Sequence, residues 1–143
     1  MKNHLFQKPI FWAIVIFLAA SVFRLFFLDL IEFKYDEAFT VFQMSQFYAH
    51  PYLMQTGPPQ STGVYNPPLF NYLMVILSFF SRDPQYLSFL IALINSVFIA
   101  AFYLVLKKFY GQMPAVFTSL SIAIAPWSII FSRKIWIPDL IFP

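Results

Sequence analysis

The sequence predicts an all-α integral membrane protein with about three transmembrane helices and with interfacial helices in a long first outer loop. Two observations support this class. Hydrophobic residues make up 60% of the 143 residues and charged residues only 10%, which is more apolar surface than a soluble domain of this length can bury. Long apolar runs also alternate with short polar segments along the chain, as expected for membrane-spanning helices.

The composition also excludes several classes of site and partner. Cysteine is absent, so the chain has no disulfide framework, no thiolate nucleophile and no thiolate metal ligand. The net charge is only +3, and the basic residues are scattered among short segments rather than forming a stripe that would bind nucleic acid. We therefore expect a membrane environment and no nucleic-acid partner. The two histidines, His4 and His50, do not make a metal site.

The first transmembrane helix is expected over residues 9–31, after a short basic tail at residues 1–8. The apolar run is long enough to cross the hydrocarbon core, and Pro9 suits the first helical turn. A cleaved signal peptide is the alternative, but no A-x-A cleavage site follows the run. The basic tail predicts a cytoplasmic N-terminus, so the loop that follows faces outward.

Residues 32–83 are expected to form this outer loop, with helices along the membrane surface. Residues 35–50 have helical spacing of their aromatic side chains, whereas residues 51–68 are rich in turn formers and cannot form one regular element. The apolar run 67–80 is fourteen residues long. It would reach about 21 Å as a helix, against a hydrocarbon core of about 30 Å, so both an interfacial helix and a full span remain open.

Two further transmembrane helices are expected over residues 84–106 and 113–131, and residues 132–143 are expected to begin the next outer segment. Asn95 lies in the middle of the second span, where a hydrogen bond between helices is the favoured role. The chain ends on apolar residues and Pro143, which predicts that it is the N-terminal part of a longer protein.

The polar residues near the outer boundary are the candidates for chemistry. Asp36 and Glu37 are adjacent in a chain with only six acidic residues. Arg24 lies in the outer part of the first span, where an arginine costs about 2.5–3.5 kcal/mol on insertion scales. Local alternatives exist for each: Asp36 could cap the helix that follows, and Arg24 could extend to the interface without a ligand.

The order of these motifs resembles the N-terminal region of the membrane glycosyltransferases of the C-type fold that use polyprenyl-phosphate sugars. These include the protein O-mannosyltransferases and the aminoarabinose transferases that modify lipid A. The matching segments are the Asp-Glu pair at 36–37, Pro-Pro-Leu at 67–69, and Phe-Ser-Arg at 131–133 with Asp139 downstream. Before Pro-Pro-Leu this chain has Asn66, where the mannosyltransferases tend to have His and the lipid A enzymes Lys.

The resemblance implies inverting transfer of a sugar from a polyprenyl-phosphate donor to the hydroxyl of a lipid, glycan or protein acceptor. It assigns the general base to Asp36, with Glu37 orienting a partner or binding a cation, and it implies no certain cofactor beyond a candidate divalent cation. Such transfer needs a base near the acceptor oxygen and fixed cations near the departing phosphate. The residues expected to bind the donor are Arg24, Tyr65, Asn66, Arg133 and Asp139.

The same resemblance helps to choose the topology and the location. An outer-face active site needs Asp139 on the side of Asp36, which requires that residues 67–80 do not span. The flanking Lys and Arg residues number four on each side in that case, against five inside and three outside if residues 67–80 span, so charge alone mildly favours the latter. We predict three spans in the plasma membrane of a bacterium or archaeon.

Two alternatives to an active enzyme remain. The chain could be a non-enzymatic membrane subunit or a transporter fragment, in which Arg24, Asp36 and Glu37 form an internal ion pair or an ion path. It could also be an inactive, truncated remnant of the enzyme, because three spans do not enclose a long lipid donor together with its acceptor. For the same reason we expect no sugar transfer by the 143-residue chain alone.

Overall fold

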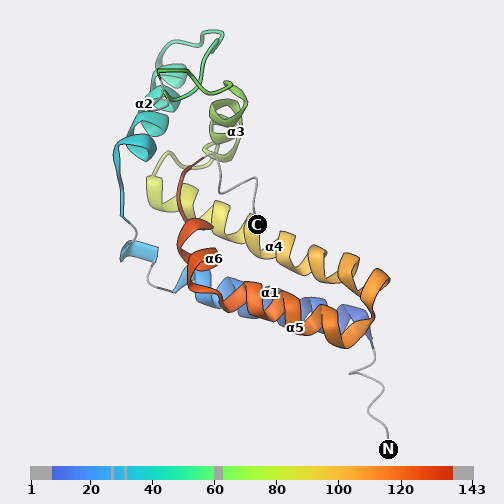
Figure 1. Cartoon of the computed structure of the whole chain (residues 1–143). Coiled ribbons are helices and arrows are strands. Elements are labelled where there is room, and N and C mark those ends of the chain that lie inside the picture. The colour runs from blue at the N-terminus through green and yellow to red at the C-terminus, as the bar shows by residue number, and fades with distance from the viewer. Residues whose placement is uncertain (1–7, 27, 31, 60–62, 137–143) are drawn as a thin grey trace, which may run out of the picture.

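The computed structural model describes residues 8–26, 28–30, 32–59 and 63–136, and this part of the chain is helical, without strands (Figure 1). The all-α prediction is confirmed. The helices are α1 (Pro9–Leu25), the 3-10 helix η2 (Leu28–Leu30), α2 (Tyr35–Ala49), α3 (Leu69–Leu77), α4 (Pro84–Tyr110), α5 (Gln112–Ile124) and α6 (Pro126–Phe131).

Helices α1, α4 and α5 pack side by side as a bundle, with α1 and α5 running in one direction and α4 in the other (Figure 1). Helices α2 and α3 pack against each other at the end where α1 stops and α4 begins, which we call the loop end. At the opposite, turn end, Gly111 joins α4 directly to α5. Its φ of 84° lies in the left-handed region, which glycine adopts at no steric cost.

Half of the buried apolar side chains in the cluster between α1, α4 and α5 are alanines. Small side chains at an interface let the helix backbones approach closely, which favours helix association in lipid. The buried apolar residues of the cluster between α1, α4 and α5 are Ala13, Ile16, Ala20, Ile99, Tyr103, Ala115, Val116 and Ala123.

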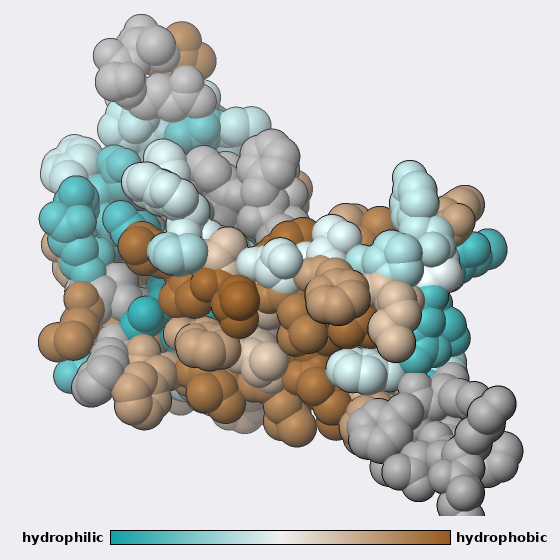
Figure 2. Space-filling model, turned by 60° about the horizontal axis from the view of Figure 1, so that its bottom comes forward, coloured by the Kyte–Doolittle hydropathy of each residue, from teal (hydrophilic) through white to brown (hydrophobic). Residues whose placement is uncertain are grey.

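Large apolar side chains instead cover the outside of the bundle. Ile10, Ile14, Leu18 and Val22 follow one another along α1, and each is at least 52% exposed. Figure 2 shows the apolar surface that such side chains form over the bundle. Helix α4, with 27 residues, is long and apolar enough to cross a membrane, whereas α1 and α5 are apolar but shorter. Small residues inside and large apolar residues outside are the arrangement expected in a lipid environment.

All three expected spans differ in their bounds from the helices observed, and the second continues to Tyr110 rather than ending at residue 106. The first helix ends at Leu25, not at residue 31, and Phe26 already has an extended conformation. The helix expected over 113–131 is divided into α5 and α6 at Ala125. The division has a physical cause, because Pro126 has no N–H to donate and disfavours a helical conformation in the residue before it.

Helix α3 forms only part of the apolar run 67–80. It has nine residues, about 13 Å of helix, and ends at Ser78, whose hydroxyl donates to the Val75 carbonyl at 2.9 Å. Tyr48 of α2 donates to the same carbonyl at 2.8 Å. Together with the buried Met44, Met74 and Leu87, these bonds fix α3 beside α2 at the loop end rather than alongside the bundle.

Candidate functional site

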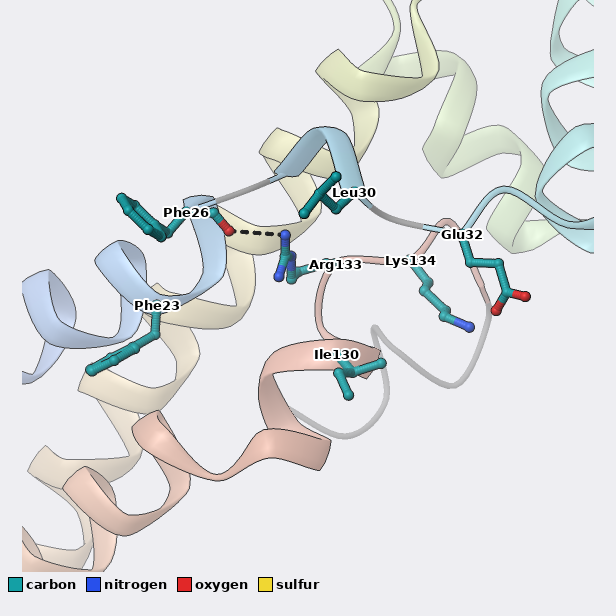
Figure 3. A pocket seen from close by; sticks show the side chains of 7 residues that line it. All are labelled: Phe23, Phe26, Leu30, Glu32, Ile130, Arg133 and Lys134. Atoms are coloured by element: carbon teal, nitrogen blue, oxygen red, sulfur yellow. Dashed lines mark hydrogen bonds between the residues drawn. The ribbon is translucent and has the colours of Figure 1, made fainter.

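A cleft of about 440 Å³ opens at the loop end, between the last turn of α1, the segment that follows it and the end of α6 (Figure 3). Two cationic side chains, one acid and four apolar side chains line it, and we call it the basic cleft. These residues are Arg133, Lys134, Glu32, Phe23, Phe26, Leu30 and Ile130. Phe23 and Phe26 are also exposed on the outside of α1, so the cleft joins the apolar surface of the bundle to a pair of cations.

The Arg133 side chain is held in place within the basic cleft. Its Nη2 donates to the Phe26 carbonyl at 3.0 Å, at the residue where α1 ends (Figure 3). Partial burial lowers the pKa of Arg133, and the nearby Asp29 opposes this effect. Because an arginine still stays protonated at neutral pH, Arg133 supplies a fixed positive charge to the cleft.

The one acid of the basic cleft already has a cationic partner. Glu32 forms an ion pair with Lys34, at 2.8 Å between Lys34 Nζ and a Glu32 oxygen. The hydrogen bond from Lys34 lowers the pKa of Glu32, and Lys134 lowers it further. Glu32 is thus balanced by Lys34 on the exposed side of the cleft. The charges of Arg133 and Lys134 leave the cleft with a positive balance.

Arg24 lies outside the lining of the basic cleft and is fully buried, with 0% of its surface exposed. Its guanidinium donates to the carbonyls of Ala20 at 3.2 Å and Ala123 at 2.9 Å, and to the Ser128 hydroxyl at 2.6 Å. The helix break at Pro126 leaves the last carbonyls of α5 without helical N–H partners, and a cation is favourable at a helix C-terminus. Arg24 therefore ties α1 to the junction of α5 and α6.

The two adjacent acids of α2 have different environments. Lys34 is the N-cap residue of α2, and its backbone N–H donates to the Glu37 carboxylate at 3.0 Å. Glu37 is only 4% exposed, so it is the acid that caps the helix. Asp36 is exposed, and its carboxylate makes no hydrogen bond within the part of the chain that the structure describes. The capping role considered for Asp36 thus belongs to Glu37.

Tyr65 and Asn66 lie in the loop before α3, away from the basic cleft lining. The Asn66 side chain and its backbone N–H both donate to the Pro58 carbonyl, each at 3.0 Å. Gly57 donates its N–H to the Asn66 carbonyl at 2.7 Å, and a Cβ at Gly57 would lie 2.7 Å from the Pro67 carbonyl oxygen. Asn66 therefore closes this loop, whereas Tyr65 is exposed.

Of the predicted site residues that the structure describes, only Arg133 lines the basic cleft. Asp139 lies outside the described residues. Sequence reasoning missed Lys134, Phe23 and Phe26 as parts of one site, although Lys134 directly follows a predicted residue. Among the described residues, no group of three or more His, Asp or Glu side chains is placed to hold a metal ion.

Comparison of the chain with protein-family models, with curated proteins and with solved structures finds no match.

Proposed function

We propose that this chain is the N-terminal module of an inverting membrane glycosyltransferase that uses a polyprenyl-phosphate sugar, and that the basic cleft binds the lipid phosphate. The acceptor would be a hydroxyl of a lipid, glycan or protein at the outer face of the plasma membrane. The proposal joins the resemblance of the ordered sequence motifs to one observation, which is the pairing of two cations with an apolar, aromatic wall in the basic cleft.

The chemistry of this cleft suits an amphipathic anion. Arg133 and Lys134 can make charge-assisted hydrogen bonds to phosphate oxygens, and Phe23 and Phe26 continue from the cleft onto the apolar face of α1. A lipid tail could follow this face while its phosphate stays at the loop end. Fixed cations at that place also stabilise the charge that develops on the phosphate when the sugar departs.

The proposed topology has α1, α4 and the α5–α6 pair crossing the membrane, with the N-terminus in the cytoplasm. Residues 112–131 cover about 30 Å of helix, and α3 is too short to add a crossing. The acids of the described residues all lie at the loop end, namely Asp29, Glu32, Asp36, Glu37 and Asp83, whereas Lys8, Lys107 and Lys108 lie at the turn end. Acids contribute little to orientation, and the loop end also carries Lys34, Arg82, Arg133 and Lys134, so the basic tail before α1 is the feature that favours a cytoplasmic turn end.

In this proposal Asp36 takes the proton of the acceptor hydroxyl. Its exposure leaves it open to a substrate, and the cap formed by Glu37 fixes the first turn of α2 around it. The alternative of a membrane subunit with an internal ion pair is less well supported, because Arg24 bonds to carbonyls and a hydroxyl rather than to Asp36 or Glu37.

Equilibrium binding of polyprenyl phosphate to the chain in lipid nanodiscs tests the proposed cleft. Arg133→Gln combined with Lys134→Gln should weaken binding by about 10²-fold to 10⁴-fold, because hydrogen bonds to charged groups contribute about 1.5–3 kcal/mol each and two such groups are lost. The matched control is Lys107→Gln with Lys108→Gln at the turn end, which should leave the affinity unchanged. Equal binding of polyprenol, which lacks the phosphate, or equal losses in both double variants would contradict the proposal.

A further inference from the structure

A second cleft, of about 510 Å³, is also lined by residues of η2 and has the opposite charge. Asp29 reaches it from η2, and Asp83 and Gln85 reach it from the beginning of α4, against which η2 packs. No lysine or arginine is among the residues that line it. We call it the acidic cleft.

Ser88 provides a second observation at this cleft. It is only 7% exposed and lines the cleft, yet its hydroxyl makes no hydrogen bond within the described chain. A serine inside a helix usually donates to the carbonyl four residues before it, as Ser96 does to Ala92 at 2.8 Å on the same helix. Because this residue is nearly buried, lines the cleft and has no protein partner for its hydroxyl, the Ser88 hydroxyl is available to a ligand in the cleft.

The two carboxylates retain free coordinating capacity. Asp83 is the N-cap of α4 and accepts from the Gln85 N–H through Oδ1, at 3.0 Å, which leaves Oδ2 for another partner. Asp29 has Arg133 as its nearby cation, but the Arg133 Nη2 is bonded to the Phe26 carbonyl and its side chain faces the basic cleft. The acidic cleft therefore has an excess of negative charge.

We propose that the acidic cleft binds a hydrated divalent cation of the Mg²⁺ class, with Asp29 and Asp83 as charged ligands and the Ser88 hydroxyl as a neutral ligand. The donors are all oxygen atoms, which select hard cations over Zn²⁺ or Cu²⁺. Two carboxylates balance the charge of one dication. Mg²⁺ is commonly held by one or two carboxylates and keeps several waters, each of about 30 Å³, for which this cleft has room.

Such an ion would join η2 to the beginning of α4. Since residues of η2 line both clefts, the ion would also fix a segment that the acidic cleft shares with the basic cleft. The inference does not depend on sugar transfer or on phosphate binding, because it concerns binding of the metal alone.

The test is titration of the purified chain with Mn²⁺, in nanodiscs of uncharged lipid, with the free ion followed by electron paramagnetic resonance. We expect one site that Mg²⁺ competes for. Asp83→Asn should weaken it at least tenfold while keeping the helix cap, because asparagine is an equally good N-cap. Asp29→Asn should have a similar effect, and Ser88→Ala should weaken binding about twofold to fivefold.

The control is Asp36→Asn, which removes an exposed carboxylate at the same end of the bundle and should leave Mn²⁺ affinity unchanged. Thermal unfolding of each variant without metal verifies that the fold is kept. Absence of a competable site in the wild-type chain would overturn the proposal. So would wild-type affinity in Asp83→Asn or Ser88→Ala, or a loss in Asp36→Asn as large as in Asp83→Asn, since that would indicate non-specific binding to surface acids.

Discussion

Arg24 is a buried cation whose partners are carbonyls and a hydroxyl rather than an acid. From the sequence, an arginine in an apolar run suggested either a ligand site or a side chain that extends to the interface. Neither hypothesis included Pro126. The helix break at Pro126 frees carbonyls of α5 for Arg24 only when α1 lies beside α5. The position of Arg24 therefore depends on a tertiary contact between residues 99 positions apart, which no local pattern indicates.

The hydrogen bond between Arg24 and Ser128 is expected to contribute to the stability of the chain. Arg24→Met should destabilise the chain by about 1–3 kcal/mol, because it leaves the Ala123 carbonyl and the Ser128 hydroxyl without their donor. Ser128→Ala should also destabilise it, and the double variant should lose less than the sum of the two, with a coupling of about 0.5–3 kcal/mol.

Unfolding in detergent, with wild type, both single variants and the double variant, gives this coupling. Ser45→Ala is the matched control, because the Ser45 hydroxyl bonds only within an exposed turn of α2. Strictly additive losses for Arg24 and Ser128 would show that their contact contributes nothing.

At the scale of elements, the apolar runs predicted where helices lie better than where they end. Composition and length indicated α1, α4 and α5, because a long apolar run has few other folds available. The ends of α1 and α5 depend on Phe26 and Pro126, and only Pro126 carries a local signal. The basic cleft was not predictable as a unit, because its lining residues from the end of α1 and from the end of α6 meet only after the bundle has assembled.

The short helix α3 leads to a testable prediction about the side of the membrane on which its flanking residues lie. In the proposed topology α3 does not cross, so residues on both sides of it should face the same side of the membrane. The chain has no cysteine, so single cysteines can be introduced for labelling in intact cells. Gln55→Cys and Arg82→Cys should both react with an impermeant thiol reagent added outside, and Lys108→Cys should be protected. Labelling of only one of the two positions that flank α3 would show that residues 67–80 cross the membrane.

At the scale of the whole molecule, the described acids, both clefts and the first turn of α2 all lie at the loop end of an apolar bundle (Figure 1). The bundle itself offers small buried side chains and an apolar outer surface. Polar chemistry is therefore concentrated at one boundary, where a lipid-linked substrate and a water-exposed acceptor could meet. This arrangement leads to the central claim, which is that Asp36 is the base in a sugar transfer at this boundary.

Sugar transfer from a polyprenyl-phosphate sugar, measured with the purified enzyme of which this chain is proposed to be the N-terminal module, tests that claim most directly. Asp36→Asn should lower the transfer rate by about 10²-fold to 10⁴-fold, the usual contribution of a general base, while expression and thermal stability hold. Glu37→Gln is the matched control, because glutamine keeps an oxygen that can accept from Lys34 and cap α2, so its rate should stay close to wild type. A rate near wild type for Asp36→Asn would contradict the account.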